Sequence, residues 1–163
     1  MPLVRNASPL LAVLVLSLSA CSQEAARSDR QQDVARRGAE VMPFDLERTT
    51  HIFKPLADGG VQSVIADEPV DRKQVTLIRQ HLRKEALAFS RGDFTDPEHI
   101  HGPGMPGLDL LTTRYEEISV RFSRTPTGAE IRYWTDPPEM VDALHAWFQA
   151  QLMDHGDHAQ HDS

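Results

Sequence analysis

The sequence predicts an α+β fold in which two ββα units form a four-stranded antiparallel sheet with two helices packed on one face. One observation is an internal repeat with an offset of 69 residues. A second is a glycine-containing turn between two β-rich runs in each half, and a third is an amphipathic helix that follows each hairpin. The repeat aligns Phe53 with Phe122, Gly59 with Gly128, and Asp67-Glu68-Pro69 with Asp136-Pro137-Pro138.

Two hairpins supply the four expected strands. Residues 49–54 and 61–66 flank Asp58-Gly59, and Asp-Gly between two β-rich runs favours a tight hairpin turn. Residues 118–123 alternate apolar and polar side chains, and residues 130–135 return after a second glycine turn. This alternation has a period of two, so each strand has one face toward the core and one toward solvent.

The two helices are expected at about residues 70–90 and 139–153. Asp67 and Asp136 are natural N-cap residues, and the prolines beside them suit a first helical turn. Each helix has an apolar stripe that repeats every three or four residues and would face the sheet. The stripes are Val75, Ile78, Leu82, Ala86 and Phe89 in the first helix, and Val141, Leu144, Phe148 and Leu152 in the second.

The N-terminus has the pattern of a bacterial lipoprotein. Residues 1–20 read as an export signal whose apolar run, residues 10–18, is shorter than the roughly 20 residues of a membrane-spanning helix. Leu18-Ser19-Ala20-Cys21 matches a lipobox, so we expect cleavage before Cys21 and lipidation of its thiol. Ser22 rather than aspartate follows, which favours the periplasmic side of the outer membrane. Cys21 is the only cysteine, so no disulfide is expected.

The remaining chain divides into three expected regions. Residues 21–40 are polar and read as a flexible tether, residues 41–154 form a single domain, and residues 155–163 form a disordered tail rich in histidine and aspartate. Without Arg5 of the signal, 16 basic residues stand against 24 acidic ones, a formal charge of −8. This acidic balance argues against nucleic acid as a partner.

A transition-metal site is the leading functional hypothesis, with copper favoured over zinc. His99 and His101 lie in a loop rich in glycine and proline, where an extended backbone would place both imidazoles on the same side. Met105 adds a thioether four residues later. Copper prefers imidazole with thioether, and Zn²⁺ would need only the histidines.

Three more histidines are candidate metal ligands. His51 falls on the core face of the first expected strand, where an imidazole needs a hydrogen-bond partner or a metal. His81 and His145 flank the apolar stripes of the two helices and are ligands of second rank. If both helices cover the same face of the sheet, the three side chains could converge between them.

Two other hypotheses remain open. The chain could be a non-catalytic module that docks an envelope protein and uses its histidines structurally, or a small hydrolase or haem-binding protein that uses His51 and His145. The sequence contains no Gly-x-Ser-x-Gly motif, no phosphate-binding glycine loop and no His-Glu-x-x-His motif, so no catalytic residue is assigned.

Three motifs resemble those of a family of small exported proteobacterial lipoproteins. They are Thr49-Thr50-His51-Ile52-Phe53, His99-Ile100-His101-Gly102 with Met105-Pro106-Gly107, and Ala143-Leu144-His145-Ala146-Trp147-Phe148. Members often carry the label aspartate carbamoyltransferase, but nothing here matches the Ser-Thr-Arg-Thr-Arg phosphate loop of that enzyme. The resemblance implies an exported domain from about residue 41 to 155, and it assigns no activity.

Overall fold

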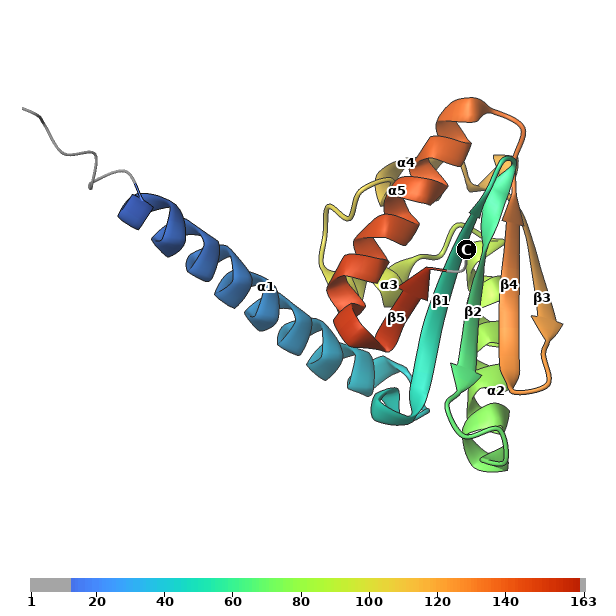
Figure 1. Ribbon diagram of the computed structural model, residues 1–163. Helices are drawn as coiled ribbons and strands as arrows, with labels where there is room; N and C mark the ends of the chain where they lie inside the picture. Colours follow the sequence, from blue (N-terminus) through green and yellow to red (C-terminus); the bar gives the residue numbers. More distant parts are fainter. Residues whose placement is uncertain (1–12, 162–163) are drawn as a thin grey trace, which may run out of the picture.

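A computed structural model describes residues 13–161, with side chains described from residue 23 onward (Figure 1). It contains five α-helices and a five-stranded mixed sheet with the strand order β3-β4-β2-β1-β5. The strands are β1 (Thr49–Leu56), β2 (Gly59–Ala66), β3 (Ser119–Arg124), β4 (Gly128–Trp134) and β5 (Ala159–His161). The helices are α1 (Val13–Val41), α2 (Arg72–Phe89), α3 (Thr95–His101), α4 (Leu108–Thr113) and α5 (Pro138–His155), with short 3-10 turns η1 (Leu46–Arg48), η2 (Tyr115–Glu117) and η3 (Gly156–His158).

The predicted α+β class is confirmed, and the chain contains the units β1-β2-α2 and β3-β4-α5. Strands β1 to β4 pair antiparallel, as expected. The expectation of four strands is wrong, because β5 adds to the edge of β1 in parallel, with His51 opposite Ala159. Residues 155–161, expected to be a disordered tail, therefore form the end of α5, η3 and β5.

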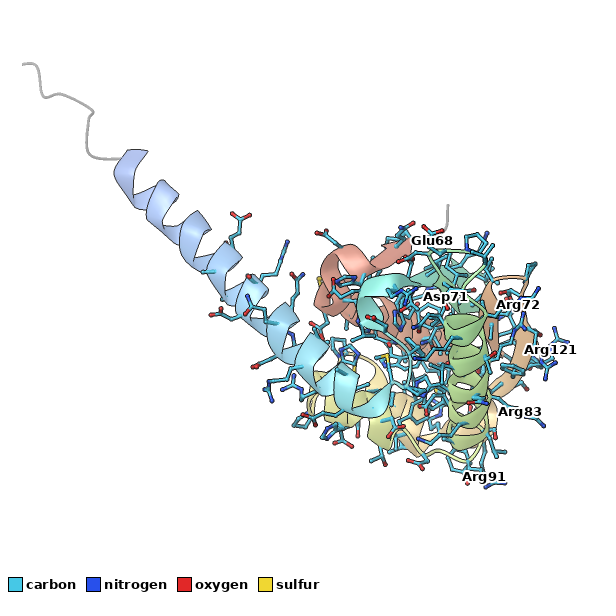
Figure 2. All side chains as sticks on the ribbon, turned by 90° about the horizontal axis from the view of Figure 1, so that it is seen from below. Glu68, Asp71, Arg72, Arg83, Arg91 and Arg121 are labelled. Carbon is cyan, nitrogen blue, oxygen red and sulfur yellow. The ribbon has the colours of Figure 1, made fainter. Side chains whose placement is uncertain are left out.

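One face of the sheet is buried under helices. His51 pairs with Val64, which pairs with Ala129, so these three buried side chains share that face. Both α2 and α5 contact the sheet strands. The polar side of α2 faces outward, and Figure 2 shows Arg72 and Arg83 projecting from it.

Aromatic rings fill the layer between α5 and the sheet. Phe148 is 1% exposed, and its ring centroid lies 5.3 Å from that of Phe53 and 5.8 Å from that of Tyr133. Gly60 on β2 permits this packing, since a Cβ atom there would lie 2.4 Å from Phe148 Cε2. A side chain at residue 60 would therefore force the helix away from the sheet.

The helix starts differ from the expected ones. Asp71 caps α2 by accepting a hydrogen bond from the Gln74 amide, and Pro137 precedes α5. Asp67 does not cap a helix, because α2 begins only at Arg72; its carboxylate instead accepts a hydrogen bond from Thr50 Oγ1 at 2.7 Å. Four residues of turn then separate Asp67 from α2.

Residues 21–40, expected to be a flexible tether, belong instead to α1. Figure 1 shows this helix running from the domain and projecting beyond it. Its C-terminal part packs on the domain, because Val34 is 1% exposed and Arg37 Nε donates to the Ile100 carbonyl at 2.6 Å. Most of the expected signal, residues 1–12, and the Cys21 side chain lie outside what the structure describes. No helix within residues 13–161 is long and apolar enough to cross a membrane.

Candidate functional site

A cavity of about 40 Å³ lies beneath the helices on the buried face of the sheet. It has room for a few water-sized groups. Four of the eight histidines of the chain line it, namely His51, His81, His101 and His155. Its other polar walls are Gln62, Glu85, Asp96 and Gln151. The cavity is therefore far more polar than the aromatic core around it.

Three of these imidazoles form a cluster at one end of the cavity. His51 comes from β1, His101 from the last turn of α3 and His155 from the last turn of α5. The rings of His51 and His155 are stacked with centroids 4.6 Å apart, and His101 meets His155 edge-on at 5.1 Å. All three residues are less than 10% exposed.

His101 is held by a buried carboxylate. Its Nδ1 lies 2.9 Å from Asp154 Oδ2, and because a carboxylate only accepts, Nδ1 carries a proton; in the neutral ring, Nε2 then has the free lone pair. Arg30 on α1 donates to both oxygens of Asp154, at 2.5 and 2.7 Å. Burial acts to raise the pKa of Asp154, but the hydrogen bonds from His101 and Arg30 outweigh it and hold this pKa below its ordinary value. Asp154 therefore fixes both the tautomer and the orientation of His101.

Burial keeps the other imidazoles neutral. Burial, with smaller contributions from the neighbouring histidines His81, His101 and His158, lowers the pKa of His51 to about 3. Burial also lowers the pKa of His155 well below its ordinary value. Both rings are thus uncharged at neutral pH, which is the form that binds metal ions.

A pair of carboxyl groups, from Glu85 and Asp96, also lines the cavity. Burial, helped by a hydrogen bond with Asp96, raises the pKa of Glu85 to about 7. Asp96 is the charged partner, because Lys84 Nζ donates to it at 2.7 Å. His81 Nδ1 lies 3.9 Å from Glu85 Oε1, and burial lowers the pKa of His81 to about 4. Glu85 is thus partly protonated at neutral pH, beside the charged carboxylate of Asp96.

The buried neutral histidines make stability depend on pH. The unfolded chain protonates each histidine near pH 6.5, whereas the folded pKa values of His51 and His81 are about 3 and about 4, and that of His155 is lowered too. The stabilisation is therefore complete above pH 6.5 and is lost as the pH falls. The raised pKa of Glu85 acts in the opposite direction between pH 4.5 and 7. It involves one proton, whereas the three histidines together involve three, so the histidines determine the sign.

We expect the free energy of unfolding to fall by about 2 to 3 kcal/mol as the pH is lowered from 6 to 5. Urea unfolding followed by circular dichroism at both pH values measures this slope. The single variant His51→Gln is the control. It removes one of the groups that bind a proton on unfolding, so its free energy of unfolding should fall less steeply, by about 1.4 kcal/mol per pH unit. Equal stability at pH 5 and pH 7.5 would contradict burial of neutral imidazoles.

The structure brings together some of the expected ligands. His51, His81 and His101 line the cavity. His99 does not, because residues 99–101 are helical and two helical residues spaced by two point about 200° apart. The expectation of an extended His-x-His loop is therefore wrong, and the half-exposed His99 side chain lies 3.3 Å from Glu40 instead.

Two further expected ligands, Met105 and His145, do not line the cavity. Met105 is 5% exposed within the hydrophobic core, and the methionine that lines the cavity is Met42. His145 Nε2 lies 3.0 Å from the Leu56 carbonyl and 2.8 Å from the Gly59 carbonyl, so it ties α5 to the β1–β2 turn. A haem slot between His51 and His145 is not supported, since a cavity of about 40 Å³ is far smaller than a porphyrin.

His155 and its carboxylate neighbour are the main residues that the sequence reasoning missed. The second helix was expected to end near residue 153, which placed His155 in a tail. A signal was present, because His155 follows Phe148 by seven residues and Gln151 by four, and so continues the buried stripe of α5.

His155 also lines a second space, at the surface. Together with Asp154 it lines a groove of about 250 Å³ between α1 and the C-terminal segment. The groove includes Glu47, Asp157 and His158, and His158 Nε2 lies 3.4 Å from Glu47 Oε1.

As they stand, no three His, Cys, Asp or Glu side chains within the described part of the chain are arranged to hold a metal ion. The stacking explains this for the imidazole cluster. A metal binds in the plane of each ring, and the planes of His51 and His155 differ by only 8°, so their lone pairs do not converge. Comparisons with known proteins found no matching family, no matching curated protein and no matching solved structure.

Proposed function

We propose that this chain is a lipid-anchored periplasmic protein that binds one transition-metal ion, copper or zinc, through His51, His101 and His155. The observation that carries the proposal is the cluster of three buried imidazoles, which come from three separate elements and lie within 5.1 Å of their neighbours. Burying three imidazoles in contact is costly unless they are paired or bind a ligand.

The surroundings of the cluster support a metal rather than a hydrogen-bonded core. Asp154 accepts from His101 Nδ1, the carboxylate–histidine arrangement that orients metal-binding imidazoles in proteins. His51 Nδ1 is buried, with no hydrogen-bond partner among the described residues. Met42 brings a thioether to the same cavity, which favours copper, whereas the three imidazoles alone suit Zn²⁺.

Metal binding requires a local change at the stacked pair. Rotation of the His155 ring about its side-chain bonds would turn its lone pair toward His51 and His101. His155 borders both the cavity and the groove beside α1, and these are the two spaces into which the ring would turn.

Metal retention tests the proposal. The chain from Ser22 onward, without an affinity tag, is exposed to Zn²⁺ or Cu²⁺, desalted and assayed by elemental analysis. We expect one retained equivalent, lost in the double variant His51→Ala, His101→Ala. The matched control is His99→Ala, His161→Ala, which removes two exposed histidines and should retain the metal. No retention by the unaltered protein would exclude the site.

The lipid anchor is a separate part of the proposal. Cys21 follows Leu18-Ser19-Ala20, and the chain after it continues in α1 toward the domain. Cys21→Ser is expected to abolish incorporation of a radiolabelled fatty acid and to remove the mature protein from the membrane fraction. Ser19→Thr, which changes the same motif conservatively, is the control. Membrane attachment that survives Cys21→Ser would contradict lipidation of this thiol.

A further inference from the structure

Basic side chains of this acidic chain are concentrated on one side of the domain. Residues 72–92, which include α2, carry six arginine and lysine residues and a single acidic residue, Glu85, which is buried. Residues 118–129, which include β3, carry Arg121 and Arg124 and no acidic residue. Figure 2 shows four of these arginines on the side of the molecule turned away from α1, namely Arg72, Arg83, Arg91 and Arg121. A chain of formal charge −7 therefore has one positively charged face.

Most arginines of this face have no carboxylate partner. Five exposed arginines form no ion pair with any residue between 23 and 161: Arg72, Arg83, Arg91, Arg121 and Arg124. Arg79 differs, because it donates to the carbonyls of Gly128 at 3.0 Å and Thr125 at 2.5 Å and so fixes α2 against the turn after β3. At the start of α2, the carboxylate of Asp71 is already paired with Arg48. The positive charge of the face is thus available to an anionic partner.

Strand β3 adds an unpaired sheet edge to this face. It is the first strand in the order β3-β4-β2-β1-β5, and within the part of the chain that the structure describes it pairs with β4 alone. Figure 1 shows β3 at the outer side of the sheet. Alternate residues of an edge strand direct their N–H and C=O groups outward, where they can pair with another strand. The edge therefore offers main-chain hydrogen bonds to an extended peptide.

The two faces of this edge carry different side chains. Val120 and Phe122 pair with buried residues of β4, so they face the helices, where they are partly buried. Arg121 lies on the opposite face, and its guanidinium carbon is 5.8 Å from the centroid of the Trp134 ring. An added strand would meet apolar side chains on one face and an arginine on the other.

We propose that the free edge of β3 binds an extended segment of a partner protein in which acidic and apolar residues alternate. The main chain of the segment pairs with β3, its carboxylates meet Arg121 on the open face, and its apolar side chains extend the layer of Val120 and Phe122. This inference does not depend on the proposed metal site.

Two other occupants fit this edge less well. A second copy of the chain would bring the arginines of two β3 edges together, and like charges on adjacent strands are destabilising. The membrane of the proposed lipid anchor is also disfavoured, because the face is turned away from α1, the helix that contains Cys21. The charge and the free edge together favour an acidic strand.

Binding of a synthetic peptide tests the inference. The probe is a short fluorescent peptide of alternating glutamate and valine, added to the full-length protein in neutral detergent with a metal chelator and followed by fluorescence polarisation. We expect saturable binding that weakens with added salt. The peptide should also slow hydrogen–deuterium exchange of residues 119–124, because their outward amides become paired.

Charge reversal on β3 is the decisive variant. Arg121→Glu should weaken peptide binding about tenfold or more, because it replaces a charge-assisted hydrogen bond with repulsion. Arg36→Glu is the matched control, since it makes the same change of charge at a side chain of α1 that is 65% exposed, and it should alter the affinity less than about twofold. Arg124→Glu repeats the test on the same strand if Arg121→Glu does not fold.

A second probe separates strand addition from charge attraction alone. Methylation of every peptide nitrogen removes the main-chain donors and keeps the carboxylates, so it should abolish binding. Equal binding of the methylated peptide, no binding of the unmethylated one, or exchange protection only outside residues 119–124 would overturn the inference. Binding of phosphatidylglycerol micelles in place of the peptide would assign the face to a lipid surface and overturn it too. The metal site would stand or fall separately, by metal retention.

Discussion

Replacing His155 with alanine is expected to lower the affinity for Zn²⁺ or Cu²⁺ by about a hundredfold or more. The imidazole of His155 contacts both other members of the cluster, at 4.6 and 5.1 Å between ring centroids. Its loss removes one of the three ligands and the ring that lies against the other two. Loss of a mere orienting partner already costs ten- to a hundredfold in metal sites, and loss of a ligand costs more. Competition titration with a chromophoric chelator measures the affinity.

The neighbouring His158 provides the control for this prediction. It belongs to the same C-terminal segment, but its side chain is 38% exposed and contacts Glu47 at the surface. His158→Ala should therefore change the equilibrium affinity less than about twofold. An equal loss in both variants would indicate nonspecific binding by the C-terminal histidines rather than a buried site.

Replacing Phe148 with alanine is expected to destabilise the fold by about 3 to 5 kcal/mol, the usual cost of removing a fully buried phenylalanine. The ring lies between Phe53 on β1 and Tyr133 on β4, and therefore joins α5 to the centre of the sheet. Thermal unfolding should show a midpoint lower by about 10 °C. Leu87→Ala is the control, because Leu87 is 54% exposed and its truncation should change the midpoint little. Similar midpoints for the two variants would contradict the packing of α5 on the sheet.

The alternation and the repeat were sufficient to predict the central sheet. Phe53 and Phe122, 69 residues apart, both lie in strands that begin a ββα unit. The same alternation correctly placed His51 on the buried face. These features depend on local periodicity, which the sequence displays directly.

The fifth strand gave no comparable signal. β5 contains three residues, and it forms only because η3 returns the chain from α5 to the edge of β1. So short a strand has too few residues to show alternation, and its composition of histidine and aspartate suggested disorder. Tertiary pairing with β1, not local preference, determines its conformation.

The conformation of the His-x-His segment was also decided by its context. Glycine and proline after residue 101 suggested a loop, but Asp96 and Pro97 occupy the first turn of α3, where both residue types favour a helix start. Arg37 then fixes the end of α3 from α1 through the Ile100 carbonyl. The polar composition of residues 21–40 predicts a flexible tether, so neither this contact nor the role of Arg30 at Asp154 follows from the sequence.

The position of the metal tests the central claim most directly. A crystal of the protein soaked in Zn²⁺ and measured at the zinc absorption edge gives that position by anomalous scattering. We expect one peak about 2.0 to 2.1 Å from one ring nitrogen each of His51, His101 and His155, with the His155 ring turned out of its stack. A peak confined to His158 and the surface groove would contradict the proposed metal centre. So would the absence of a peak at the cluster when the soak contains zinc in excess over the protein.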